Sequence, residues 1–99
     1  MPELKLGQLV LSCAGRDKGR FMLVIKILDS QYVYVADGVL RRVENPKKKK
    51  IKHLKILNKR AGFIAEKIEN NKKIYNEEIR RALEELVDLN LKDEESSQV

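Results

Sequence analysis

The first 57 residues alternate short apolar runs with turn residues, and this alternation limits the possible folds more than any other feature of the chain. Side chains within these runs fall on two faces at the two-residue period of a β-strand, as Phe21, Leu23 and Ile25 do on one face of the second run. The expected strands cover residues 9–13, 20–28, 32–36, 39–43 and 53–57. Short strands joined by tight turns in so short a segment predict a small, partly closed, five-stranded barrel.

Glycine, aspartate and proline mark the turns between these strands. Gly15 and Gly19 bound a charged connection, and glycine tolerates the positive φ angles of a tight turn. Asp37 and Gly38 together are typical of a two-residue hairpin loop. Pro46 ends the fourth expected strand, because proline has no amide hydrogen to donate to a sheet.

Helical spacing replaces this alternation after Asn58. Residues 59–69 are expected to form a short helix. Asn76 is a suitable N-cap for a second helix that ends near Leu89, since Glu77 and Glu78 favour the positive end of a helix. This helix carries an apolar stripe that needs a partner, either the barrel or another protein: Ile79, Ala82, Leu83, Leu86 and Val87.

The fold is therefore predicted to be mainly β, with α+β character overall. Residues 1–58 form the barrel, and residues 59–91 form a helical appendage that packs on the barrel or docks a partner. Residues 92–99 contain no apolar anchor before the final valine, so they are expected to be a disordered acidic tail.

Several classes of protein are disfavoured by composition. A single cysteine, Cys13, permits no intramolecular disulfide and no all-cysteine zinc site, and its place in the first strand predicts a buried small side chain. The longest apolar stretch is too short to span a membrane, and no secretory leader is recognisable. No spacing pairs a nucleophile with a base. We expect a cytoplasmic, non-enzymatic protein with no cofactor, metal, membrane or small-molecule substrate.

Charge is distributed unevenly along the chain. Residues 1–60 contain 15 lysines and arginines against five acidic residues, a net charge of +10, whereas residues 61–99 carry a net charge of −4. The barrel is therefore expected to bind a polyanion, with the acidic appendage away from the bound surface.

Two segments concentrate the positive charge. In the connection between Gly15 and Gly19, Arg16 and Lys18 lie beside exposed backbone amides, and Arg20 follows, a combination that suits phosphate oxygens. The second segment begins at Arg41 and Arg42 and continues into a dense run: Lys47, Lys48, Lys49, Lys50, Lys52 and Lys55. Lysines bind phosphate as point charges and report little about base identity.

Tyr32 and Tyr34 share one face of the third expected strand. If exposed, they form a stacking platform for unpaired bases. The alternative is a half-buried pair with the hydroxyl groups at the rim, and the sequence leaves both open.

The segments at residues 14–20, 36–38 and 46–50 together resemble the KOW motif family of RNA-binding proteins. Residues 6–57 are similar to bacterial KOW-domain proteins related to eukaryotic and archaeal large-subunit ribosomal proteins. The resemblance implies an SH3-like barrel whose first loop contacts RNA, with ribosomal RNA and ribosomal proteins as partners. Those ribosomal relatives usually carry longer extensions than this acidic helical tail, which counts against a permanent structural role in the ribosome.

We therefore predict a protein that binds structured RNA, in particular ribosomal RNA, mainly through the phosphate backbone. It would be ribosome-associated or act in ribosome assembly. The alternative is an SH3-like protein-interaction module that uses the C-terminal amphipathic helix.

Overall fold

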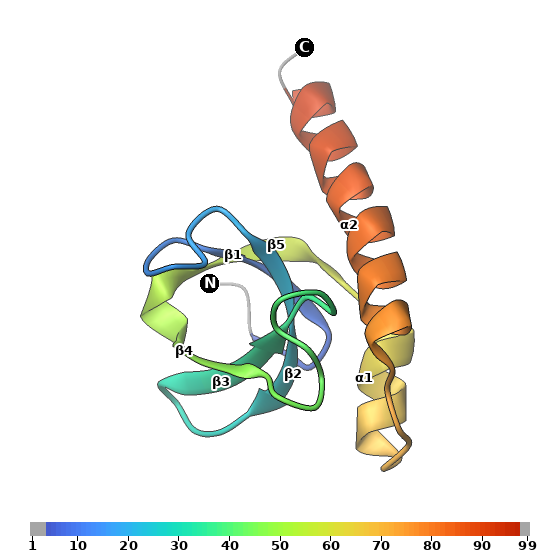
Figure 1. Ribbon diagram of the computed structural model, residues 1–99. Coiled ribbons are helices and arrows are strands. Elements are labelled where there is room, and N and C mark those ends of the chain that lie inside the picture. Colours follow the sequence, from blue (N-terminus) through green and yellow to red (C-terminus); the bar gives the residue numbers. More distant parts are fainter. Residues whose placement is uncertain (1–3, 98–99) are drawn as a thin grey trace.

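A computed structural model describes residues 4–97 and has a curled antiparallel sheet followed by two helices (Figure 1). The five strands lie in the spatial order β4-β3-β2-β1-β5. Their bounds are β1 Gln8–Ser12, β2 Phe21–Ile27, β3 Tyr32–Ala36, β4 Lys47–Lys50 and β5 Leu54–Arg60. A 3-10 turn, Ile51–His53, joins β4 to β5, and the helices are α1 Gly62–Glu69 and α2 Asn76–Ser97. The predicted five-stranded barrel with a C-terminal helical segment is confirmed.

Two of the four strand pairings in the curled sheet are irregular. The register of β1 shifts against β5 between Gln8 and Val10, and that of β2 shifts against β3 between Val24 and Lys26. Such irregularities bend and twist the strands. Gln8 supports the first bend, because its buried side-chain amide donates to Leu57 O at 2.6 Å and Lys59 O at 3.1 Å.

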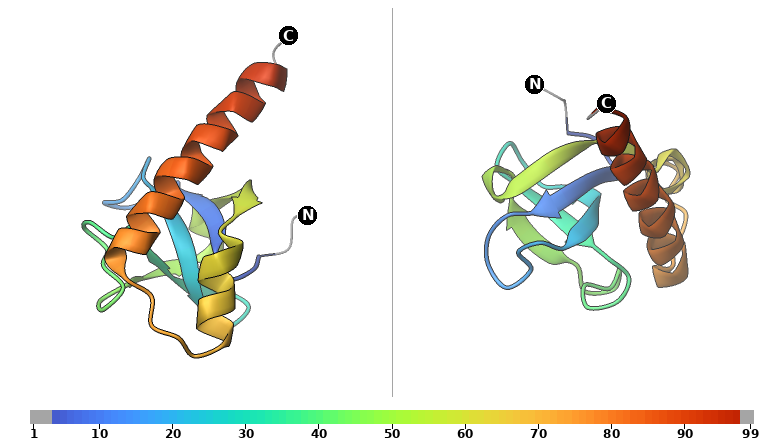
Figure 2. Two further views of the ribbon diagram at one scale, coloured as in Figure 1. Left: turned by 90° about the vertical axis from the view of Figure 1, so that its right-hand side faces the viewer. Right: turned by 90° about the horizontal axis from the view of Figure 1, so that it is seen from above.

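Both faces of the sheet carry buried apolar side chains. The barrel interior contains Val10, Met22, Val24, Val33, Val35 and Leu54. The opposite face carries Leu9 and Leu23, which pack against Ile64 of α1 and against Ile79 and Ala82 of α2. The apolar stripe of α2 thus lies on the chain's own barrel, and Figure 2 shows the helix crossing its outer face.

The helices cover this outer face only in part. Leu9 is fully buried, Leu11 is half-buried, and Cys13 at the end of the same row is exposed. The expectation of a buried Cys13 was wrong because the row continues past the helical cover.

Residues 39–43 form a loop, not the expected fourth strand. The amides of Val39 and Arg41 donate to the side chain of Asp37, and the carbonyl of Arg41 accepts from the amides of Asp37 and Gly38. Because these groups bond within the loop, they are not paired across a sheet. The fourth strand is instead the lysine run, β4, which pairs with β3.

Element ends also differ from the sequence prediction. β5 continues to Arg60, and α1 begins at Gly62. α2 continues to Ser97, so residues 92–97 are helical where a disordered tail was expected. The Asp88–Lys92 ion pair at i, i+4 spacing supports this extension. Residues 98 and 99 lie outside the described part. Within residues 4–97, no helix combines the length and apolar character of a membrane span.

Candidate nucleic-acid interface

A basic groove of about 420 Å³ lies between the residue 13–20 loop and β4. It brings together two segments that are more than 25 residues apart in the chain. Its lining consists of Gly15, Arg16, Asp17, Tyr32, Arg41, Lys47, Lys48, Lys49, Lys50 and His53. The only acidic side chain in this lining is Asp17.

Asp17 is buried and neutralised by two arginines. Arg41 Nε donates to both carboxylate oxygens of Asp17, at 3.3 and 3.2 Å, and Arg41 Nη2 lies 3.1 Å from Oδ2. Arg20 Nε lies 4.0 Å from Asp17 Oδ1. A fork of this kind fixes the position of Arg41 relative to the loop. Asp17 therefore organises the groove without making it acidic.

Lys49 is a buried lysine in the middle of the exposed lysine run. Only 7% of its surface is accessible, and its ammonium group donates to Ala14 O at 2.8 Å. This bond joins β4 to the residue 13–20 loop. We call Arg20, Arg41 and Lys49 the anchored cations, because each has an internal partner.

The remaining cations of the two basic segments are mostly open to solvent. Seven make no ion pair with any acidic side chain that the structure describes, which covers residues 4–93, and we call them the free cations: Arg16, Lys18, Lys47, Lys48, Lys50, Lys52 and Lys55. Of these, Arg16, Lys47, Lys48 and Lys50 line the groove. Lys18, Lys52 and Lys55 lie outside that lining. Arg42 is exposed and pairs with Glu44 at 3.4 Å.

Tyr32 and Tyr34 share the outer face of β3, as the alternation predicts, and both are half-buried. The ammonium group of Lys48 lies 4.6 Å from the centre of the Tyr32 ring, and that of Lys50 lies 5.9 Å away. The ring thus orients two free cations through cation–π contacts. Tyr34 does not line the groove.

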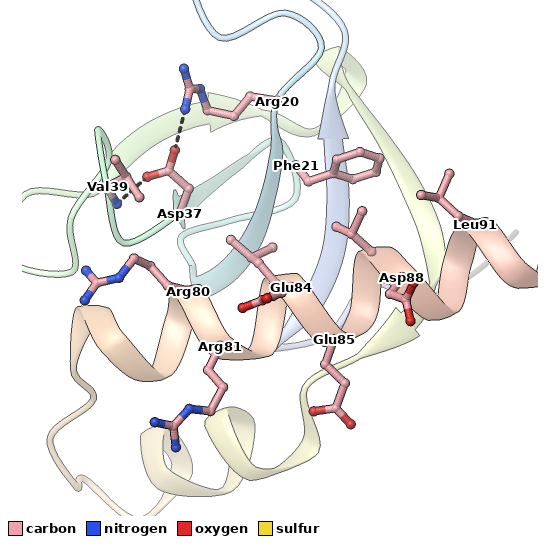
Figure 3. A pocket seen from close by; sticks show the side chains of 12 residues that line it. Arg20, Phe21, Asp37, Val39, Arg80, Arg81, Glu84, Glu85, Asp88 and Leu91 are labelled. Carbon is pink, nitrogen blue, oxygen red and sulfur yellow. Dashed lines mark hydrogen bonds and ion pairs between the residues drawn. The ribbon is translucent and has the colours of Figure 1, made fainter.

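Asp37 holds the loop that follows β3. Its Oδ1 accepts from the amides of Val39 at 2.9 Å and Arg41 at 2.8 Å, and its Oδ2 accepts from Arg20 at 3.1 Å (Figure 3). Burial alone would raise the pKa of Asp37, but these hydrogen bonds and the Arg20 charge together hold the pKa below its ordinary value of 3.8. Asp37 is therefore a carboxylate at neutral pH.

A second groove, of about 900 Å³, lies between α2 and the barrel (Figure 3). Its apolar lining includes Phe21, Val39 and Leu91, with Arg20 and Arg80 toward one end. Its α2 side is mixed in charge, with Glu84, Glu85 and Asp88 beside Arg80 and Arg81, in contrast to the basic groove.

Sequence reasoning missed the structural roles of Asp17, Asp37 and Lys49. Aspartate followed by glycine was a usable signal for Asp37, because aspartate side chains often bond amides two residues further on. No comparable signal marked Lys49, whose burial depends on its register opposite Val33.

The relatives found by comparison with known proteins include two with the same family name. The chain is similar to the large ribosomal subunit protein eL14 of Hyperthermus butylicus, at 31% identity over 90 residues, which cover 86% of this chain and 80% of that protein. The eL14 of Sulfolobus acidocaldarius is 29% identical over 90 residues, covering 86% and 81%. No model of a known protein family matches the chain.

Proposed function

Because the chain belongs to the eL14 family of large-ribosomal-subunit proteins, we propose that it binds structured RNA, in particular ribosomal RNA, through the phosphate backbone. It would act on the ribosome or during ribosome assembly, with ribosomal proteins as further partners. We also propose that, within this family, the chain is one of the bacterial KOW-domain proteins.

The basic groove is the observation that carries the proposal. Four free cations converge there, while its one carboxylate, Asp17, is buried and paired. Like charges held this close repel one another, and a bound polyanion relieves that repulsion. Arginine and lysine side chains and backbone amides are the groups that contact phosphates on nucleic acids.

We assign different roles to the free cations and the anchored cations. We assign phosphate contact to the free cations in the groove, and to Lys18, Lys52 and Lys55 as extensions of the same surface. Arg20, Arg41 and Lys49 instead hold the loops in place, because each has donors bound to a partner within the protein, namely Asp37, Asp17 and Ala14 O respectively. Arg42 adds charge beside the groove. Tyr32 supports Lys48 and Lys50 and is not a stacking platform in this assignment.

The proposed function needs no catalysis, cofactor, metal or small-molecule substrate. The protein would act in the cytoplasm, where ribosomes act. The barrel, whose last strand ends at Arg60, would be the RNA-binding part, and α1 and α2 would form the helical appendage.

The salt dependence of RNA affinity tests this function. For an RNA hairpin and about five phosphate contacts, the logarithm of the affinity should fall against the logarithm of salt with a slope of roughly −3.5 to −4.5. Replacing Lys48 and Lys50 with glutamine should make that slope shallower by about 1.4–1.8. Thermal unfolding should change little, since both side chains are on the surface.

The matched control replaces Lys5 and Lys72 with glutamine; both lysines are exposed and lie outside the groove. It removes the same net charge, so it should leave most of the slope in place. Equal effects of the two double variants would reject the groove as the binding site, and absence of RNA binding at low salt would reject the function.

The alternative function, protein interaction through the C-terminal helix, has one supporting observation. The groove between α2 and the barrel is partly apolar, and Leu91 in it is 49% exposed. Leu91→Ser should leave RNA affinity unchanged if the two surfaces are separate. Loss of RNA affinity in this variant would show that they are not.

A further inference from the structure

The loop between β3 and β4 exposes two adjacent aliphatic side chains. Val39 is 57% exposed and Leu40 is 64% exposed, the two highest values among the large apolar residues of the described chain. We call this pair the apolar tip. Single exposed apolar residues are common, but two neighbours at the end of one loop form a small continuous contact surface.

The structure holds this tip in a fixed position. Asp37 binds the amides on both sides of the pair, at Val39 and Arg41. Gly38 has a φ of +78°, and a Cβ atom at that position would lie 2.5 Å from Asn76 O. The backbone thus approaches α2 too closely for any residue other than glycine.

The first turn of α2 completes the support. Arg80 Nη1 donates to Gly38 O at 2.8 Å, and the amide of Val43 donates to Asn76 Oδ1 at 2.8 Å. Both ends of the loop are therefore tied to the helix. A loop with so many anchors loses little conformational entropy when a partner binds its tip.

Basic side chains adjoin the tip, and most of them have acidic partners within the protein. Arg41 and Arg42 follow it directly, and Val39 shares the second groove with Arg20 and Arg80. Of the nearby acids, Asp37 is buried against Arg20, and Glu44 is bound by Arg42 and Asn76. Glu84, Glu85 and Asp88 line the same groove as Val39, on its α2 side. Arg41 also lines the basic groove, so the tip continues that surface. This continuity with the basic groove favours the same anionic partner at the tip.

We propose that the apolar tip is a second RNA-contact site, which packs against riboses and base edges in the minor groove of duplex RNA. The inference rests on the proposed function and specifies the RNA as A-form duplex. The minor groove of such a duplex is wide and shallow, so it admits a loop tip. Aliphatic side chains lack the π-face used to stack on unpaired bases, which argues against a single-stranded site.

Replacing both residues of the tip with serine tests the proposal. The variant removes apolar contact but no charge, so affinity for an RNA hairpin should fall about tenfold at every salt concentration. The salt slope should stay unchanged, because the phosphate contacts remain. Affinity for a single strand of matching length should not change.

The control changes two apolar residues of similar exposure, Phe63 on α1 and Leu89 on α2, to serine. It should bind the hairpin like the unmodified protein. Thermal unfolding of both variants verifies the fold, and circular dichroism at the assay temperature verifies that each is folded when RNA is added.

Hairpin affinity equal to that of the unmodified protein would overturn the inference and leave the tip to a protein partner, while the groove proposal would stand. An equal loss in the control variant, an equal loss on single strands, or a shallower salt slope would each overturn it as well. If the unmodified protein bound no RNA, the proposed function itself would fail.

Discussion

Lys48 and Lys49 are neighbours in a run of four lysines, yet they belong to two different regions of the molecule. Lys48 is exposed and lies over the ring of Tyr32, on the solvent side of the basic groove. Lys49 is buried and binds the carbonyl of Ala14, at the junction of β4 with the residue 13–20 loop. Alternation along one strand separates a cation that can meet a partner from one that stabilises the fold.

The comparison teaches that a count of positive charges overstates the size of a polyanion interface. Of the basic residues that the sequence suggests, Arg20, Arg41 and Lys49 each have a polar partner within the protein. An edge strand rich in lysine also discourages pairing with another chain, which gives β4 a second reason for its composition. The interface depends on which cations remain available.

The largest expected effect comes from removing the carboxylate that anchors Arg20. Asp37→Ala leaves the amides of Val39 and Arg41 without an acceptor and Arg20 without its ion pair, and should destabilise the protein by about 3 kcal/mol. Urea unfolding monitored by circular dichroism measures the change. Asp37→Asn keeps an oxygen for the two amides and should cost about 1 kcal/mol. Equal losses in both variants would mean that the amide bonds contribute little.

A smaller effect separates the two neighbouring lysines directly. Lys49→Met removes the donor to Ala14 O and should lower the free energy of unfolding by about 2 kcal/mol, in the range for a hydrogen bond from a charged group. Lys48→Met should change it by less than about 0.5 kcal/mol, as for an ordinary surface substitution. Similar values from urea unfolding of the two variants would remove the distinction between anchored and free cations.

Lowering the pH tests the contribution of the Asp37 carboxylate to stability. The pKa of Asp37 is lower in the folded protein than its ordinary value of 3.8, so the unfolded chain takes up its proton first as the pH falls. The stabilisation from this carboxylate is complete above the ordinary pKa and is lost as the pH falls through the folded-state pKa. Glu78, whose pKa is lowered chiefly by Lys67, acts in the same direction.

Urea midpoints should therefore fall between about pH 6 and about pH 3, and fall less in Asp37→Asn, which has no proton to bind at this position. Identical pH dependence in the two proteins would show that Asp37 gains nothing from its anchors.

Much of this architecture was predictable from local patterns. The alternation at Phe21, Leu23 and Ile25 indicates β2, and the spacing of Ile79, Ala82 and Leu83 indicates α2, because burial imposes a period on each element. The loop at 39–43 was mistaken for a strand, since Val39 and Leu40 look like strand residues while the bonds that decide their conformation come from Asp37.

The candidate interface was only partly predictable. The basic residues of both segments were recognisable from charge and from the glycines around Arg16. Their division into free and anchored cations was not recognisable. The burial of Lys49 depends on its pairing with Val33 of β3 and on its bond to Ala14, 35 residues earlier in the chain. Contacts of this kind arise from the folded barrel and leave no pattern in the local sequence.

The most direct measurement is the salt dependence of RNA affinity in Lys48→Gln and Lys49→Gln, each compared with the unmodified protein on the same hairpin. Both variants lose one charge, and glutamine at position 49 retains a side-chain donor. The free–anchored division predicts a slope shallower by about 0.7–0.9 for Lys48→Gln and an unchanged slope for Lys49→Gln. Equal slopes in the two variants, or a change only in Lys49→Gln, would contradict it.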